Sequence, residues 1–242
     1  VGQHGLRSGN VWHIWADKKR REWILTDKGT TIYNHHFSTP LPFKWIREVG
    51  DAIFLATPNG KLAVYDEKEH LVMIPMPAGV TRINQLKNTG YQLLIATNIG
   101  LVIYNPRTFK TEVINVQSPS QPMAEVKNIY TDAYGMVWVF TDGMGVTMVN
   151  PRTGQKAWLF ADQPDPGDRT TSEKFFITQD ENKTLWMVPN GGTFSYFDRK
   201  AGKLVPYLLR SNSSGNFRVP NIKKFCLSDQ GILWISGMHD LT

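Results

Sequence analysis

Six segments of the sequence share one short pattern, and this repetition constrains the fold more than any other feature of the chain. In each segment an aromatic residue or a leucine sits among apolar residues, and a turn and a second apolar stretch follow it. These anchors are Trp23, Phe54, Leu94, Trp138, Trp186 and Trp234. Successive anchors lie 31 to 48 residues apart. Short β-prone segments repeated about every 40–50 residues are typical of propeller blades.

Each complete repeat contains four β-prone stretches. In the fourth repeat they are 126–131, 136–140, 145–150 and 156–160, and the turns between them are rich in Asp, Asn and Gly. Such turns favour antiparallel hairpins, and the chain shows no sustained helical periodicity. A four-stranded sheet cannot bury both of its faces alone. We therefore expect an all-β propeller in which neighbouring sheets pack around an axis, with the anchors between them.

The repeats divide the whole chain, residues 1–242, into a partial β-propeller with about five full blades and a half blade. The expected blades are 11–40, 41–79, 80–121, 122–170 and 171–219, and the half blade is 220–242. The sixth repeat stops after its second strand, and the first ten residues cannot supply two more. We therefore expect this chain to be a segment of a longer protein.

Charge and hydropathy exclude several classes of function. The 27 basic residues exceed the 21 acidic ones by a mild margin that is compatible with an acidic ligand. They are scattered over many turns rather than gathered on a helix or stripe, so we expect no binding to nucleic acid. No apolar run reaches the ~18 residues that a membrane helix needs.

Motifs for catalysis and for metal binding are absent from the sequence. There is no Gly-x-Ser-x-Gly, no phosphate-binding Gly-x-x-x-x-Gly-Lys and no His-Glu-x-x-His. His35 and His36 are adjacent on a predicted strand and would point to opposite faces. The sequence therefore predicts no catalytic residue, no metal and no cofactor.

The single cysteine, Cys226, excludes an internal disulfide. We align the first strands of the repeats by counting back from the hairpin turn that follows each, and we call each aligned position a column. Cys226 falls in a mostly apolar column, which predicts a buried structural thiol. The other members of this column are Ile14, Trp45, Ile129 and Ile177.

The repeat resembles the two-component regulator propeller repeat. The fourth unit carries the resemblance best, through Asp132, Gly135, Trp138, Thr141, Gly145, Asn150 and Pro151. The first and third units repeat much of it, whereas the fifth has Pro189 where Thr is expected. The resemblance extends over nearly the whole chain. These motif residues build blades, so they indicate fold more strongly than chemistry.

The resemblance implies a function and a location. Proteins with this repeat are typically hybrid two-component sensors of Bacteroidetes, whose periplasmic half holds seven-bladed propellers ahead of a membrane helix and a histidine kinase. They sense oligosaccharides released from glycans. For this chain, the resemblance implies a periplasmic segment of a seven-bladed ring that is not itself an enzyme. The implied partners are an oligosaccharide, the remaining blades, the downstream sensor domains and a second copy in a homodimer.

Topology indicates where a ligand would bind. Antiparallel strands reverse direction, so the loop entering each blade and the turn between its second and third strands emerge at the same edge. The entry loops, 75–79, 117–122, 162–171 and 210–219, are the longer and more variable connections, and function concentrates on such loops. Amide and guanidinium groups suit hydroxyls, carboxylates and sulfates. The predicted ligand-binding residues are Arg82, Asn84, Lys127, Asn128, Arg169, Lys174, Arg218, Lys223 and Lys224.

Two further sets of residues support this placement. Asp27, Asn59, Asn98, Asp142 and Asn190 lie in the turns between second and third strands. The column containing Asn128 varies between repeats, which suits ligand binding better than packing; its other members are predicted to be His13, Lys44, Asn84, Phe176 and Phe225.

The sequence therefore favours a sensor segment that recognises an oligosaccharide, and the mild positive charge is compatible with an anionic one. Two other classes of function stay open: a propeller enzyme, either a lyase or a glycosidase acting on a polysaccharide, and a structural dimerisation array without a ligand.

Overall fold

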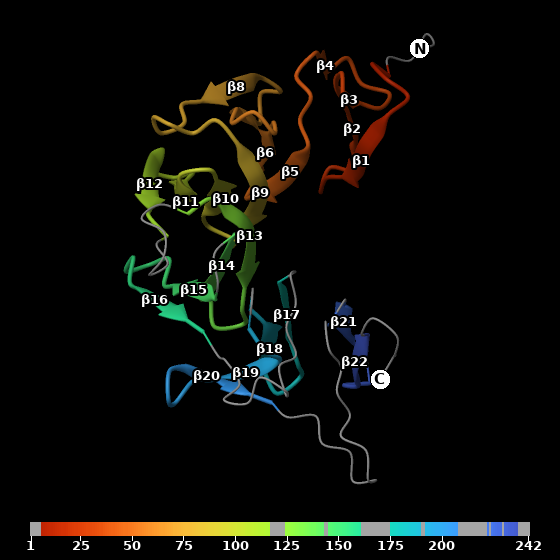
Figure 1. Ribbon diagram of the computed structural model, residues 1–242. Helices are drawn as coiled ribbons and strands as arrows, with labels where there is room; N and C mark the ends of the chain where they lie inside the picture. Colours follow the sequence, from red (N-terminus) through yellow and green to blue (C-terminus); the bar gives the residue numbers. More distant parts are fainter. Residues whose placement is uncertain are drawn as a thin grey trace. The chain divides into compact units, whose positions relative to one another are not determined.

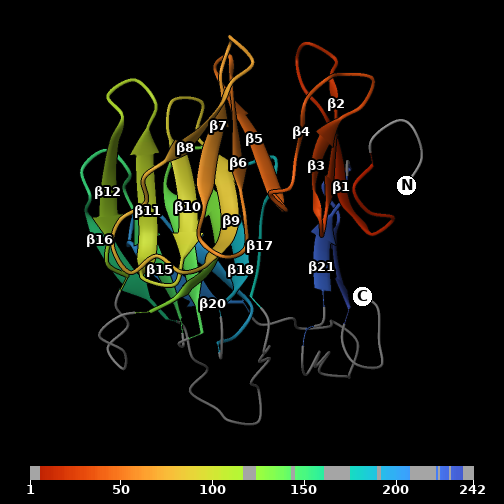
Figure 2. The ribbon, with the colours of Figure 1, turned by 90° about the horizontal axis from the view of Figure 1, so that it is seen from above.

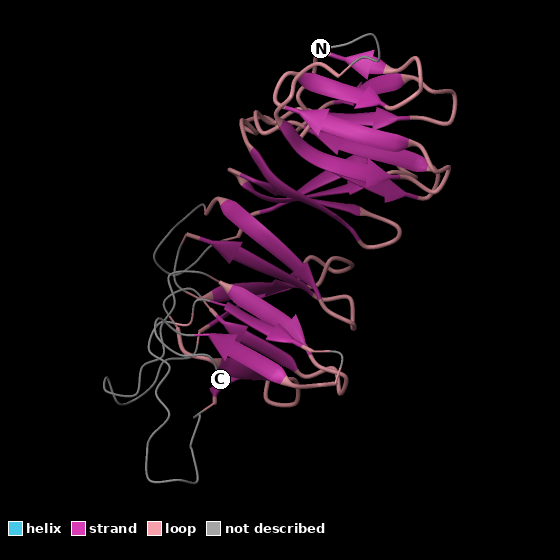
Figure 3. Ribbon diagram, turned by 90° about the vertical axis from the view of Figure 1, so that its right-hand side faces the viewer, coloured by secondary structure: helices cyan, strands magenta, loops and turns pink. Residues whose placement is uncertain are grey.

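The computed structural model describes residues 6–116, 124–142, 145–160, 175–189, 192–207, 222, 224–228 and 230–236. Within these ranges every regular element is a β-strand, and none is a helix that could cross a membrane (Figure 1, Figure 3). The chain forms two compact units, Val1–Asn115 and Val116–Thr242.

Unit 1 contains three four-stranded antiparallel sheets, and in each the strands neighbour one another in chain order (Figure 1, Figure 2). Their strands are β1 (Val11–Ala16), β2 (Glu22–Thr26), β3 (Gly29–Ile32) and β4 (Ser38–Thr39); β5 (Trp45–Val49), β6 (Ala52–Ala56), β7 (Leu62–Tyr65) and β8 (Leu71–Ile74); and β9 (Ile83–Asn88), β10 (Leu93–Thr97), β11 (Gly100–Asn105) and β12 (Lys110–Ile114).

The described residues of unit 2 form two further four-stranded sheets and a two-stranded sheet. Their strands are β13 (Val126–Thr131), β14 (Val137–Thr141), β15 (Val146–Val149) and β16 (Lys156–Leu159); β17 (Phe176–Gln179), β18 (Leu185–Val188), β19 (Ser195–Asp198) and β20 (Lys203–Pro206); and β21 (Lys224–Leu227) and β22 (Leu233–Ser236). These sheets confirm the predicted all-β class with five full blades and a half blade.

The hydrophobic core of each unit lies between neighbouring sheets. Trp23 and Phe54 are fully buried in unit 1, as is Trp138 in unit 2. Each packs edge-on against an aromatic ring in the third strand of the following sheet; the Trp23 and Tyr65 ring centroids, for example, are 5.1 Å apart. This confirms the predicted place of these anchors. Trp234, the anchor of the two-stranded sheet, differs because it is 44% exposed.

An aspartate six residues before an anchor tryptophan explains the Asp in the repeat. The indole Nε1–H of Trp138 donates to Asp132 Oδ2 (3.0 Å), and the same bond joins Trp23 to Asp17 (3.1 Å) and Trp186 to Asp180 (2.9 Å). The other carboxylate oxygen accepts backbone N–H groups of the hairpin turn. The carboxylate therefore closes the turn and satisfies the buried indole donor at once.

The charge of the first of these aspartates is stabilised locally. Burial raises the pKa of Asp17, but hydrogen bonds from Trp23 and Arg21 outweigh that effect. Its pKa therefore lies below the ordinary value of 3.8.

A glycine stands at the start of the third strand because a backbone oxygen at the end of the fourth strand lies too close for a side chain. At Gly100, where φ is +128°, a Cβ would lie 2.6 Å from the Ile114 carbonyl oxygen. At Gly145, where φ is +84°, it would lie 2.6 Å from the Leu159 oxygen. No side chain fits so close to a backbone oxygen, and a positive φ adds strain.

Candidate ligand-binding site

In unit 1 the loop entering a blade lies beside the turn between second and third strands, as predicted. The backbone N–H of Asp27 donates to Asn10 O (3.4 Å), and that of Asn98 donates to Arg82 O (3.3 Å). We call this side of each sheet the entry edge. The first strands are also the ones that meet between blades, because β5 lies against β9. Side chains at the start of a first strand therefore lie where the blades converge.

The pairing of first and second strands is irregular at this edge in three blades. The register of β1 against β2 shifts between Val11 and His13, which leaves Trp12 as an extra residue. The same shift leaves Asn84 as the extra residue in β9 and Lys127 in β13. Such β-bulges redirect side chains and are common near functional sites. Lys44, just before β5, occupies the corresponding position in the second blade.

The observed strand pairing corrects the predicted columns, because bulges and hairpins of unequal length shift the alignment of the first strands. Asn128 pairs with Phe140, two residues after its anchor. The residues paired in this way elsewhere are His13, Trp45, Gln85, Phe176 and Lys224. The predictions for Lys44, Asn84 and Phe225 were therefore wrong by one residue. A shift of one residue matters because neighbouring side chains in a strand point to opposite faces.

The same error affects the prediction for the cysteine. Cys226 pairs with the anchor Trp234 itself, so its counterparts are residues such as Trp15 and Tyr130 rather than the isoleucines. Those positions are only half-buried, and Cys226 is exposed. The expected buried structural thiol was wrong.

Five of the predicted ligand-binding residues lie in described parts of the chain. In unit 1, Arg82 is exposed just before β9, and Asn84 occupies the bulge two residues later. In unit 2, Asn128 is exposed and its Oδ1 accepts the Ile129 N–H (3.0 Å), while Lys224 is exposed on β21. The remaining predicted residues lie outside the described residues; they are Arg169, Lys174, Arg218 and Lys223.

Lys127, the fifth of these residues, already has acidic partners. Its Nζ lies 3.1 Å from both Glu125 Oε2 and Asp142 Oδ2. Burial disfavours the ammonium, but the hydrogen bonds and charges of these carboxylates outweigh it and raise the pKa of Lys127. A ligand would have to compete with two carboxylates for this cation.

One of the second-turn residues has a structural role. The Oδ1 of Asn98 accepts the N–H groups of Thr81 (2.8 Å) and Arg82 (2.9 Å), while its Nδ2 donates to Gly79 O (2.9 Å). Asn98 therefore fixes the segment that carries Arg82 rather than offering its amide to a ligand.

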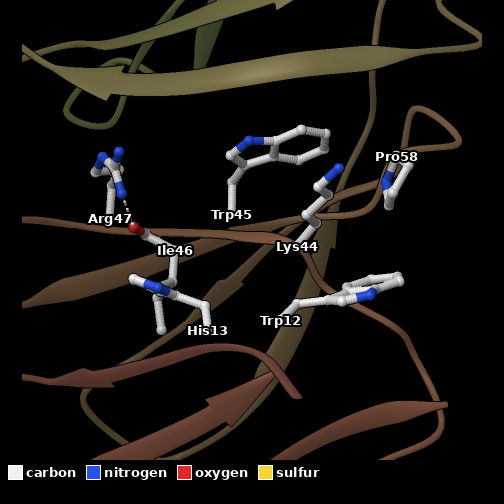
Figure 4. Close-up of a pocket in the computed structure, with 7 residues that line it drawn as sticks. All are labelled: Trp12, His13, Lys44, Trp45, Ile46, Arg47 and Pro58. Carbon is white, nitrogen blue, oxygen red and sulfur yellow. Dashed lines mark hydrogen bonds between the residues drawn. The ribbon is translucent and has the colours of Figure 1, made fainter. Parts of the chain in front are cut away.

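A pocket of about 360 Å³ opens beside β1 and β5 in unit 1, with Trp12 and His13 on the β1 side of β5 and with Trp45 and Arg47 on its other side (Figure 4). It is lined by Trp12, His13, Lys44, Trp45, Ile46, Arg47 and Pro58. In Figure 4 Lys44 and the two indoles lie toward Pro58, whereas Arg47 and His13 lie toward the other end. Its volume falls within the roughly 300–1,000 Å³ of small-molecule sites.

Sequence reasoning pointed to His13 and Lys44 but missed Trp12, Trp45 and Arg47. The two tryptophans could have been noticed because they fall outside the anchor positions of the repeat. Arg47 could not, because a lone arginine in a strand is ordinarily a solvated residue.

Positive charge is concentrated at this pocket. The Arg47 guanidinium donates from Nη1 to Ile46 O (2.7 Å), and burial lowers its pKa. Burial and the nearby Arg47 charge also lower the pKa of Lys87 on β9. Lys44 Nζ lies 5.4 Å from the Trp45 ring centroid. In the described part of the chain no carboxylate forms an ion pair with Arg47 or Lys44.

The described residues provide no ready metal site. No group of three or more His, Cys, Asp and Glu side chains gathers among them. His35 and His36 lie in the turn between β3 and β4, so the prediction that they are on a strand was wrong. His35 Nε2 lies 3.3 Å from Glu69 Oε2.

Comparisons with known proteins place the fold. No protein-family model and no curated protein matches the chain. Among solved structures, it is similar to the extracellular domain of the hybrid two component system BT4673 from B. thetaiotaomicron, with a TM-score of 0.62 and 18% identity over 99% of this chain. The chain spans only 34% of that extracellular domain.

Two other structures match with comparable scores. Virginiamycin B lyase from Staphylococcus aureus has a TM-score of 0.59 and 10% identity, covering 98% of this chain and 87% of the lyase. PorZ, a surface component of the type-IX secretion system of Porphyromonas gingivalis, has a TM-score of 0.60 and 12% identity, covering 97% of this chain and 40% of PorZ. At these identities the comparisons establish the β-propeller fold alone.

Proposed function

We propose that this chain is a ligand-recognition segment from the extracytoplasmic propeller of a hybrid two-component signalling protein. Two observations support the assignment: the repeat resembles that of such regulators, and the fold matches the extracellular domain of BT4673 over 99% of the chain. The location would be periplasmic, and a histidine kinase elsewhere in the parent protein would receive the signal.

The recognition role rests on the entry edge. There the bulged first strands direct Trp12, Asn84 and Lys127 away from the regular ladder, above a scaffold of fully buried anchors. Variable polar and aromatic side chains on a rigid framework are what ligand recognition requires.

The ligand we propose is a glycan-derived oligosaccharide. Its hydroxyls would accept hydrogen bonds from the Arg82 guanidinium. They would both donate hydrogen bonds to the Asn84 side-chain amide and accept them from it. Binding that favours one arrangement of a sensor dimer, or of the downstream domains, would pass the signal on, because a ligand shifts an equilibrium by its difference in affinity for the two states.

Calorimetry with the purified chain tests this proposal. We expect saturable binding of at least one neutral or acidic oligosaccharide, with weaker binding in the Arg82→Ala and Asn84→Ala variants. Lys68→Ala is the control, since Lys68 is exposed at the opposite edge. Unchanged affinity in both entry-edge variants, or no binding across the panel, would contradict the proposal. Hydrolysis or elimination products would instead support the enzyme alternative.

A further inference from the structure

The pocket beside β1 and β5 has a chemical character of its own. It opens beside the first strands of two blades in unit 1, at the side where Lys44 enters β5 and Pro58 begins the β6–β7 turn (Figure 4). The ligand inferred for this pocket rests on the proposed recognition function. The pocket would be one of the sites through which that function is carried out.

The cations of this pocket favour an anion. Arg47 is half-buried, its burial disfavours the charged form, and Lys87 adds a second positive charge nearby. The Arg47 guanidinium donates to the neutral Ile46 carbonyl, and the ion pairs of the described residues leave it without a carboxylate. A partly desolvated guanidinium in this setting gains most from a bound carboxylate or sulfate.

The aromatic side chains favour a flat, partly apolar ring. Trp12 is 37% exposed, although an indole ordinarily buries much of its area. Trp45 is half-buried, with the Lys44 ammonium 5.4 Å from its ring centroid. Neither residue is an anchor, although Trp45 also packs against the core between the second and third blades. A pyranose presents an apolar face of C–H groups that can pack on such a ring.

We propose that this pocket binds an acidic oligosaccharide, with Arg47 and Lys44, which lie toward opposite ends of the pocket, each pairing with a carboxylate or sulfate, and with Trp12 packing against a sugar ring. Both acids offer oxygens that a guanidinium can engage through two parallel hydrogen bonds. His13 lies at the Arg47 end of the pocket and adds a ring donor or acceptor there.

The first experiment compares three trisaccharides by calorimetry with this chain: trigalacturonate, O-sulfated galactotriose and galactotriose. We expect the acidic ligands to bind at least about tenfold more tightly than the neutral one, the effect of one charge-assisted contact. Lys44→Ala and Arg47→Gln should each remove about tenfold in affinity for the acids alone. The relative affinity of trigalacturonate and the sulfated sugar identifies which acid the pocket prefers.

Matched controls separate the pocket from general effects. Lys68→Ala removes an exposed lysine from the opposite edge of the same blade, and Trp158→Ala removes a tryptophan of similar exposure, 39%, from unit 2. Both should leave affinity unchanged, whereas Trp12→Ala should weaken the binding of every trisaccharide. Thermal unfolding confirms that each variant is folded.

A second experiment tests the anion site without a sugar. Sodium sulfate, compared with sodium chloride at equal ionic strength, should shift the indole N–H signals of Trp12 and Trp45 in NMR spectra saturably. The Lys44→Ala/Arg47→Gln double variant should lose these shifts. Sulfate binding here without any binding of sugars would retain the anion site but contradict the glycan-sensing function.

The opposite outcome is equally informative. If galactotriose binds as tightly as its acidic counterparts, and the two cation variants change neither affinity nor the sulfate response, the anion site is refuted. Glycan recognition by the entry edge would then stand alone.

Discussion

Replacing Asp132 by alanine tests how the repeat holds its blades together. In the wild type, Oδ2 accepts the Trp138 indole N–H (3.0 Å) and a hydrogen bond from Arg199 Nη2 (2.8 Å). Its Oδ1 accepts the backbone N–H groups of Tyr134 (2.8 Å) and Met136 (3.0 Å). Because Arg199 extends from the next blade of unit 2, one carboxylate links a hairpin turn, an anchor and a neighbouring sheet.

The expected cost depends on how far water can replace each lost bond. Trp138 is fully buried, so its N–H loses its partner and costs about 1–3 kcal/mol. The Arg199 side chain is 29% exposed and stacks on Tyr134 at 3.9 Å, so water replaces part of its bond and we add about 1 kcal/mol. The turn amides are near solvent and add little. We expect a loss of about 2–4 kcal/mol in the free energy of unfolding of unit 2.

Urea unfolding followed by circular dichroism measures this loss, with an unchanged m-value showing that the surface exposed on unfolding is the same. Asp198→Ala is the matched control, since Asp198 Oδ1 accepts two turn amides but the carboxylate receives no indole or guanidinium bond in the described structure. In a Trp138→Phe background, Asp132→Ala should cost at least about 1 kcal/mol less. Equal losses for the two aspartates, or no coupling to Trp138, would refute the reasoning.

Three other substitutions test a close backbone contact, a buried carboxylate and the pocket cation. Gly100→Ala should destabilise unit 1 by about 2 kcal/mol more than Gly50→Ala in urea unfolding, because both have positive φ but only Gly100 faces a carbonyl oxygen; equal losses would count against this contact. The stabilisation from Asp17 is fully present above pH 3.8 and is lost as pH falls through its lower folded pKa. The advantage of the wild type over Asp17→Asn should therefore shrink in acid, and a constant difference would contradict it. Arg47→Met should raise the stability of unit 1 by about 0.5–1 kcal/mol while removing acid binding, because a half-buried charge without a carboxylate partner is replaced by an apolar chain of similar length. A less stable variant would show that Arg47 supports the fold.

Sequence reasoning succeeded wherever the repeat itself carries the information. The Trp138 anchor, the turns and the alternation of short apolar stretches gave the blades, because packing between sheets requires the same residue types at the same place in each unit. It failed where a single residue is inserted. The bulge at Asn84 moves each side chain before it to the other face, and nothing in the local sequence marks a bulge. The pocket was missed for a different reason: its tryptophans could have been noticed outside the anchor positions, whereas Arg47 became visible only in the structure.

This contrast suggests how a repetitive scaffold acquires a specific site. The Asp–Trp pair and the strand-initiating glycine recur because each satisfies a buried donor or a close backbone contact, which leaves them little freedom to change. A bulge at the start of a first strand releases one side chain from both constraints. At the bulge the chain has Trp12, Asn84 and Lys127, and Lys44 occupies the corresponding position without a bulge in the second blade. The blades can therefore keep their packing while the entry edge changes its ligand. Exchanging Trp12 and Lys44 with the residues of another blade should alter ligand preference more than stability.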